Sequence, residues 1–273
     1  MKSIVVPIDF SEQSEIALKV AATLAKKNNS ELVVLHMLEL ATGIMSNTEY
    51  IPQVHIVHLM KVTEERFEKF LNKPYLKDIN ITPVIKHYKV FSEIDEVAQK
   101  HGANLIVMGS HGTDGLQELF IGSNTERVVR SSEIPVLVVK GDIAHFKAER
   151  FVFASDFKEE SIPAAKKAIA FSELLGAEFK MVYINTPADA FLSTEDAYKR
   201  ISKFLNIAKL GLEVDVYNDY SVEKGVLNYA ESNAADLIGI PTHGRQGLSH
   251  FFMGSIGEDI ANHSKIPVVT FKI

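Results

Sequence analysis

The sequence of 273 residues predicts an α/β protein made of two similar domains, each with an open five-stranded parallel sheet covered by helices on both faces. Two observations carry this prediction. Short runs rich in Val, Ile and Leu alternate with segments whose apolar residues recur every three or four positions, which is typical of buried parallel strands joined by amphipathic helices. The same succession of segments then occurs a second time, which indicates a tandem repeat.

Four pairs of matching segments show the repeat. In chain order they are "IVVPIDFSE" (4–12) with "FVFASDFKE" (151–159), "LIVMGSHGTDGL" (105–116) with "LIGIPTHGRQGL" (237–248), "GS" (122–123) with "GS" (254–255), and "IPVLVV" (134–139) with "IPVVTF" (266–271). The first pair is 147 residues apart and the others are 132 apart, so the second copy is 15 residues shorter. We predict domains over 1–143 and 144–273. Most of the missing residues correspond to an extra segment within 39–66.

The elements of the first copy follow from their residue patterns. An apolar run at 4–8 predicts a strand, and the helix after it places Ile16, Val20 and Leu24 on one face, with Ser11 as a suitable N-cap. The later apolar runs and the segments between them predict strands at 31–38, 81–90, 104–109 and 134–140, and helices at 62–72, 91–102 and 123–132.

Composition and charge argue against several classes of function. The chain has a formal charge of -6 and lacks a basic run, which disfavours binding to a nucleic-acid backbone. It has no cysteine, so disulfides and thiolate chemistry are excluded. The apolar stretch at the start is too short for a signal peptide, and no run approaches the roughly 20 apolar residues of a membrane span. We therefore expect a cytoplasmic protein without membrane or nucleic-acid partners.

The stretch "GSHGTDGLQELFIGSN" at 109–124 lies where a buried strand turns into a helix. Open parallel sheets bind ligands at the carboxyl ends of their strands, where this stretch and Asp9 both lie. Glycines there let backbone amides approach an anion, and a helix N-terminus adds unpaired amides. The alternative is structural: the glycines serve turn geometry, and "SNTE" at 123–126, like "SIGE" at 255–258, forms a capping box. The second copy of the pattern favours the ligand-binding interpretation.

The spacing Gly109-x2-Gly112-x9-Gly122-Ser123 resembles the nucleotide-binding motif of universal stress proteins, G-x2-G-x9-G-[S/T]. "VVPIDFSE", "LVVLHM" and "IPVLVVK" also resemble that family, and the resemblance extends over the whole chain as a tandem pair. It implies Rossmann-like domains that bind ATP, or the related AMP or ADP, in a regulatory or sensor protein of the stress response. Mg²⁺ would be an accompanying ion.

The resemblance also implies a set of nucleotide-contacting residues in the first copy. Pro7 and Asp9 would lie beside the adenosine, and the backbone of Met37 would meet the adenine edge. The ribose and phosphates would be framed by Met108, Gly109, His111 and Gly112. The phosphates would be held at the helix start by Gly122, Ser123, Asn124 and Thr125. The extra segment after Met37 would then serve as a lid over the ribose.

The second copy departs from the motif. Pro241 stands at the position of Gly109, which removes a backbone N–H and fixes φ. Ala154 replaces Pro7, and Ile256 and Gly257 replace the residues after the Gly-Ser pair. The remaining candidates for a second site are Asp156, Ile184, His243, Gly244, Gly254 and Ser255. We expect the first copy to be the nucleotide site, and the second to bind more weakly, to bind something smaller, or not to bind.

No catalytic residue and no metal site are predicted. Histidine ordinarily titrates near neutral pH, which suits a general base, but neither His111 nor His243 comes with a recognisable nucleophile in the sequence, so a contact to phosphate or loop backbone fits them better. His55 and His58 lack a further ligand at an obvious spacing and are typical of a helix surface. Asp9 either coordinates Mg²⁺ through ATP or caps the turn after its strand.

Three alternative functions stay open: a protein-interaction scaffold whose glycine loops are turns, a slow Mg²⁺-dependent ATPase, and a binder of another small ligand in the C-terminal half. The expected partners are an adenine nucleotide and an unidentified regulatory protein. The closing strands, Val136 to Lys140 and Val268 to Ile273, are apolar edges that need cover. In the family such strands pair two domains, which implies an internal pseudo-dimer, and a homodimer of the whole chain is a further expectation.

Overall fold

The structure, a computed structural model, describes residues 1–38, 53–87, 92–110, 122–141, 146–187, 191–242 and 255–273. The elements of the first copy are β1 (Ser3–Ile8), α1 (Glu12–Asn28), β2 (Glu31–Leu38), α2 (Gln53–Leu71), the short helix η2 (Pro74–Leu76), β3 (Ile81–His87), α3 (Ser92–Lys100), β4 (Leu105–Gly109), α4 (Ser123–Ser131) and β5 (Val136–Val139). Those of the second copy are β6 (Arg150–Ala154), the short helix η3 (Glu159–Ser161), α5 (Ile162–Leu175), β7 (Glu178–Asn185), α6 (Thr194–Ala208), β8 (Val214–Asn218), α7 (Val222–Ser232), β9 (Leu237–Thr242), α8 (Ser255–His263) and β10 (Val268–Lys272).

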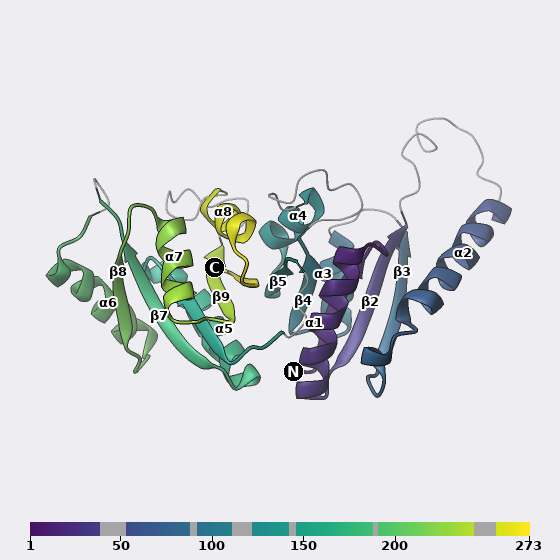
Figure 1. The fold of residues 1–273 in the computed structure, drawn as a ribbon, viewed down its shortest axis with the longest axis horizontal. Coiled ribbons are helices and arrows are strands. Elements are labelled where there is room, and N and C mark those ends of the chain that lie inside the picture. Colours follow the sequence, from purple (N-terminus) through teal and green to yellow (C-terminus); the bar gives the residue numbers. More distant parts are fainter. Residues whose placement is uncertain (39–52, 88–91, 111–121, 142–145, 188–190, 243–254) are drawn as a thin grey trace.

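The described strands form one sheet in the order β3-β2-β1-β4-β5-β10-β9-β6-β7-β8, with the two halves side by side (Figure 1). Within each half, neighbouring strands are parallel. The halves join where β5 and β10 pair antiparallel, with Val138 opposite Val268 and Leu137 opposite Val269. The predicted pair of five-stranded parallel sheets is confirmed, and so is the pairing of their closing strands.

Helices cover both faces of this sheet, as predicted. Side chains alternate along β1, so that Ile4 and Val6 enter one core and Val5 enters another. The face that carries α1, α2, α5 and α6 has a single apolar core that runs through both halves. The opposite face has two separate cores, one under α3 and α4 and the other under α7 and α8. The two copies therefore share one apolar core on one face of the sheet, and each has its own separate core on the opposite face.

Several local expectations can be compared with the described elements. Ser11 is the N-cap of α1, as predicted, and its hydroxyl accepts a hydrogen bond of 3.2 Å from the backbone N–H of Ser14. The second helix is longer than expected, because α2 begins at Gln53 and takes up part of the extra segment. Residues 39–52 of that segment and the predicted boundary at 143–144 lie outside the described residues. None of the described helices combines the length and hydropathy needed to cross a membrane.

The two copies fill equivalent core positions with side chains of different shape. Ile4 of β1 corresponds to Phe151 of β6, and Val107 of β4 corresponds to Gly239 of β9. A Cβ on Gly239 would lie 2.5 Å from Cε2 and 2.6 Å from Cζ of Phe151. The glycine in the second copy therefore makes room for the larger ring.

We expect Gly239→Ala to lower the free energy of unfolding by about 1–3 kcal/mol, because the crowded Phe151 ring packs against other rings and has little room to move. Urea denaturation measures this loss. Gly211→Ala is the matched control, because a Cβ on Gly211 meets nothing within 4 Å. Equal losses in the two variants would contradict the packing role of Gly239.

Asp95 on α3 is a half-buried residue close to Lys272 of the other half. Its Oδ1 atom is enclosed and has no hydrogen-bond partner among the described residues. Burial raises the pKa of Asp95; a hydrogen bond with Ser132 and the charge of Lys272 partly oppose this, and Glu133 adds to the rise. The folded state therefore holds the Asp95 proton more tightly than the unfolded chain does.

This difference in pKa gives stability a pH dependence with a definite sign. Above the unfolded Asp pKa of about 3.9 the folded state binds more protons, so stability falls as pH rises until Asp95 is ionised in both states. Asp95→Asn removes this titration, and we expect its stability relative to wild type to increase from about pH 4 upward and then level off. Urea unfolding over a pH series measures the difference, with the exposed Glu96→Gln as control. A relative stability that decreases with pH would show that the sign is wrong.

Candidate functional site

The strand order of the first half reverses between β1 and β4, which lie next to each other in the sheet. Connections from neighbouring strands leave in opposite directions at such a reversal, so a crevice opens at the carboxyl ends of the strands. Pro7, Asp9, Met108 and Gly109 lie at or just beyond the ends of these two strands. The fold thus brings together residues from two sequence motifs that are about 100 positions apart.

Asp9 holds the turn between β1 and α1. Its Oδ1 accepts a hydrogen bond of 3.0 Å from the backbone N–H of Ser11 and another from the hydroxyl of Ser14. The backbone N–H of Asp9 donates to the same Ser14 oxygen at 3.0 Å, and Phe10 between them has a positive φ of 65°. Of the two sequence interpretations of Asp9, the capping of the turn is the one that these contacts describe.

Gly109 at the end of β4 lies against the first turn of helix α1. A Cβ added to Gly109 would lie 2.8 Å from the backbone carbonyl oxygen of Gln13. A side chain at this position would therefore push the first turn of α1 away from the sheet. Helix packing by itself requires a glycine here, whether or not a phosphate approaches the same backbone.

Helix α4 begins directly at the crevice. Gly122 is its N-cap, with no side-chain capping hydrogen bond among the described residues, and its N–H donates to the Ser110 carbonyl at 2.6 Å. Ser123 and Asn124 in the first turn are exposed. Thr125 is buried, and its hydroxyl donates to the Gly109 carbonyl at 2.9 Å. The predicted capping box at Ser123 is wrong, because Gly122 is the N-cap and Ser123 is already the first residue of the helix.

This start differs from those of α1, α6 and α7, whereas α5 likewise has no side-chain cap at its N-cap Ser161 among the described residues. In α1, α6 and α7 a serine hydroxyl, of Ser11, Ser193 and Ser221 respectively, accepts a hydrogen bond from an amide of the first turn. The first-turn amides of an α-helix have no partner within the helix. Among the described residues no side chain caps these amides in α4, and together with the helix dipole they form a place where an anion fits.

The remaining candidates of the first copy are only partly described. Met37 is half-buried and Met108 is buried, and both pack into the core under α3 and α4. His111 and Gly112 lie outside the described residues. His58 is exposed on α2, and within the described part of the chain no group of three or more His, Asp or Glu residues is arranged to hold a metal ion.

The sequence analysis did not identify an aromatic cluster around Phe10, the residue that follows Asp9. The Phe10 ring lies 4.5 Å from that of His36, 5.4 Å from Phe67 and 5.5 Å from Phe70, centroid to centroid. His36 Nδ1 also contacts the carbonyl oxygen of Ile8 at 2.8 Å. The internal repeat could have revealed this cluster. Phe10, His36 and Phe70 correspond to Phe157, Tyr183 and Phe204, which likewise pack together.

The second copy repeats the Asp9 turn in a more closed form. Asp156 is 1% exposed, and its Oδ1 accepts hydrogen bonds from the N–H of Lys158 at 3.1 Å and the Ser161 hydroxyl at 2.9 Å. Lys158 Nζ lies 3.4 Å from Asp156 Oδ2. Phe157 has a positive φ of 55°, as Phe10 has in the first copy. The carboxylate of Asp156 is thus enclosed and paired within the protein.

The other candidates of the second copy are only partly described. Ile184 is 2% exposed and packs against Gly225, where a Cβ would lie 2.4 Å from Ile184 Cγ2. Pro241 is buried in β9 opposite Phe271. Ser255 is the first residue of α8. His243, Gly244 and Gly254 are outside the described residues.

Comparison with known proteins gives the same division into two copies. The model of the universal stress protein family matches residues 1–140 and again 147–272. Universal stress protein MJ0577 of Methanocaldococcus jannaschii is 33% identical over 51% of this chain and 94% of its own length. Universal stress protein Slr1230 of Synechocystis is 24% identical, with 100% of both chains covered.

A solved structure shares the fold of the whole chain. A universal stress protein from Archaeoglobus fulgidus covers 99% of this chain and 96% of its own length, with a TM-score of 0.69 and 21% identity. The tandem architecture therefore occurs beyond this sequence. Since the family model matches both copies and together they span nearly all of the sequence, this chain belongs to the universal stress protein family, as a tandem pair of its domains.

Proposed function

We propose that the protein binds an adenine nucleotide, ATP or the related AMP or ADP, in its N-terminal half and acts as a regulatory or sensor protein of the stress response. The observation that carries this proposal is the start of α4. Its first turn has no side-chain cap within the described part of the chain, begins at the Gly122-Ser123 pair of the family motif, and faces the reversal of strand order between β1 and β4. Uncapped amides at such a position suit a phosphate group.

The differences between the copies support the N-terminal half as the nucleotide site. Asp9 is partly exposed, whereas Asp156 is buried and paired with Lys158. Gly109 has an N–H that Pro241 lacks. The proposal also includes a cytoplasmic location, a regulatory protein partner and self-association of the chain through a surface other than the β5–β10 junction.

The interaction scaffold is the second candidate function, and one observation favours it. Gly109 is required for packing against Gln13, so this glycine of the motif is explained without a ligand. A scaffold predicts that the protein folds normally and has no measurable affinity for adenine nucleotides.

Calorimetric titration with ATP, with and without Mg²⁺, separates the two candidates. We expect binding by the wild type and at least about tenfold weaker binding by Gly122→Val, because the added side chain keeps a phosphate away from the helix start. The backbone at Gly122 has φ -60° and ψ 144°, an extended conformation that valine adopts without strain, so the fold should be retained.

The control for this titration is Gly254→Val, the matching substitution in the second copy, which should leave ATP affinity unchanged. An unchanged thermal midpoint in both variants confirms that they are folded. If the folded wild type takes up no adenine nucleotide, the nucleotide proposal is wrong and the scaffold stands. If Gly254→Val is the variant that loses binding, the site has been placed in the wrong half.

The packing role of Gly109 leads to a separate expectation. Gly109→Ala should lower the free energy of unfolding by about 1–3 kcal/mol in the absence of any nucleotide, because its Cβ meets the rigid backbone of α1. Urea denaturation measures the change, again with Gly211→Ala as control. Unchanged stability combined with lost ATP affinity would instead assign Gly109 to the ligand alone.

A further inference from the structure

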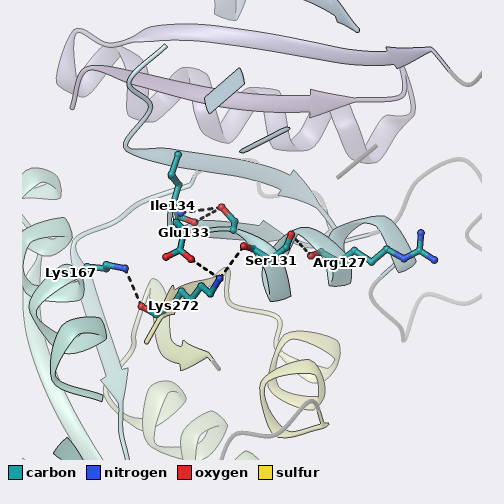
Figure 2. A network of polar contacts seen from close by, with 7 residues as sticks. Arg127, Ser131, Glu133, Ile134, Lys167 and Lys272 are labelled. Atoms are coloured by element: carbon teal, nitrogen blue, oxygen red, sulfur yellow. Dashed lines mark hydrogen bonds and ion pairs between the residues drawn. The ribbon is translucent and has the colours of Figure 1, made fainter. Parts of the chain in front are cut away.

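The C-terminal half contributes a side chain to the last turn of α4, the helix whose first turn faces the proposed phosphate position. Lys272 of β10 reaches across the junction, and Figure 2 shows its ammonium group between Glu133 and Ser131. Lys272 Nζ lies 2.7 Å from Glu133 Oε1 and 3.3 Å from the Ser131 carbonyl oxygen. A lysine in this position satisfies carbonyl groups that a helix end leaves unpaired and complements the negative end of its dipole.

Lys272 is itself held in place. Its backbone carbonyl accepts a hydrogen bond of 3.1 Å from Lys167 Nζ on α5 (Figure 2). Its backbone pairs with Thr242 of β9, and the preceding residues Val268 to Thr270 of the same strand pair with β5. The contact to α4 therefore originates from a rigid part of the C-terminal half.

Helix α4 depends on such contacts more than a long helix would. It has nine residues, several of them with low helix propensity, and isolated helices of fewer than about 12–15 residues are marginal in water. Among its residues, Thr125 and Val128 are buried. Thr125 fixes the first turn to Gly109, Val128 fixes the middle to the core, and Lys272 fixes the last turn. Because the helix is only about 14 Å long, loosening one end moves the other.

The repeat supplies an internal comparison, because Lys140 of β5 corresponds to Lys272. Lys140 Nζ donates to the carbonyl of Asn262 in the last turn of α8, so each half reaches the final helix of the other. Burial lowers the pKa of Lys140. The surroundings of Lys140 therefore stabilise its charged ammonium form less well than water does.

The surroundings of the two lysines explain this difference. Glu133, which pairs with Lys272, corresponds to Lys265 in the second copy, and Asp95, whose pKa Lys272 lowers, corresponds to Leu227. The end of α8 is instead tied within its own half, where His263 Nδ1 lies 2.5 Å from Glu223 Oε1. Of the two lysine contacts that link the halves, the contact of Lys272 with α4 is therefore the stronger.

We propose that Lys272 is a positioning residue for the nucleotide site: the C-terminal half holds α4 through Lys272 and thereby sets the first-turn amides of α4 against the crevice of the N-terminal half. This inference rests on the proposed function. It gives the C-terminal copy a role in ligand binding that needs no ligand of its own, and it makes the N-terminal site incomplete without the second copy.

Hydrogen exchange of the full-length protein without nucleotide tests the structural part of this inference. In Lys272→Met we expect the amides of α4 to exchange about tenfold faster, as loss of a charge-assisted hydrogen bond predicts, while the β-strands keep their wild-type rates. Lys140→Met is the matched control and should leave α4 unchanged. Lys272→Arg keeps donors for both Ser131 and Glu133 and should restore slow exchange.

Calorimetric titration of the same variants with ATP tests the functional part. We expect Lys272→Met to weaken binding about three- to tenfold, Glu133→Lys to do the same, and Lys272→Arg and Lys140→Met to bind as the wild type does. Glu133→Lys places after α4 the residue that follows α8 at the equivalent position, Lys265, so it provides a second variant that leaves β10 intact.

The outcomes separate this inference from the proposed function. Unchanged exchange of α4 in Lys272→Met, or faster exchange with unchanged ATP affinity, overturns the positioning role while nucleotide binding stands. A wild type that binds no adenine nucleotide overturns the proposed function and, with it, any role of Lys272 in a nucleotide site. Exchange then still decides whether Lys272 anchors α4. Equally faster exchange over the whole sheet would reduce Lys272 to a general stabilising residue and contradict the inference.

Discussion

The antiparallel pairing of β5 with β10 is the interaction on which the rest of the structure depends. Each copy ends its sheet with an apolar strand, which alone would be an exposed edge with unpaired backbone groups. Pairing the two strands satisfies both edges at once. It also brings Leu137 and Val269 into one core with α1 and α5, so that apolar burial on this face is continuous through both halves.

The same pairing gives the two faces of the sheet different roles. On the face of the shared core, the copies stabilise each other through buried apolar side chains. On the opposite face their cores are separate, and the side-chain hydrogen bonds that we describe between the copies are Lys272 to the end of α4 and Lys140 to the end of α8. Such hydrogen bonds depend on the position of each donor and acceptor. Sequence differences around the two lysines therefore make the two contacts unequal.

The two copies agree at positions that both need for their structure and differ at positions that only one copy needs. The turn after the first strand is retained in both, with an aspartate that accepts hydrogen bonds and a phenylalanine with positive φ. Both copies need this turn to direct the chain into the following helix. The motif glycine at 109 is retained only in the copy that we propose to bind nucleotide, and the second copy has Pro241 and a core with larger rings.

The sequence by itself determined the repeat, the five parallel strands of each copy and the helices on both faces, because hydrophobic periodicity reports burial directly. It also determined the cap at Ser11, which depends on neighbours three residues away. Only the tertiary structure decided why Gly109 must be glycine, that Gly122 and not Ser123 is the N-cap of α4, and what holds the end of that helix. The atoms concerned, at Gln13, Ser110 and Lys272, are far from these positions in sequence. Their proximity is set by how the strands order and pair, which no local pattern contains.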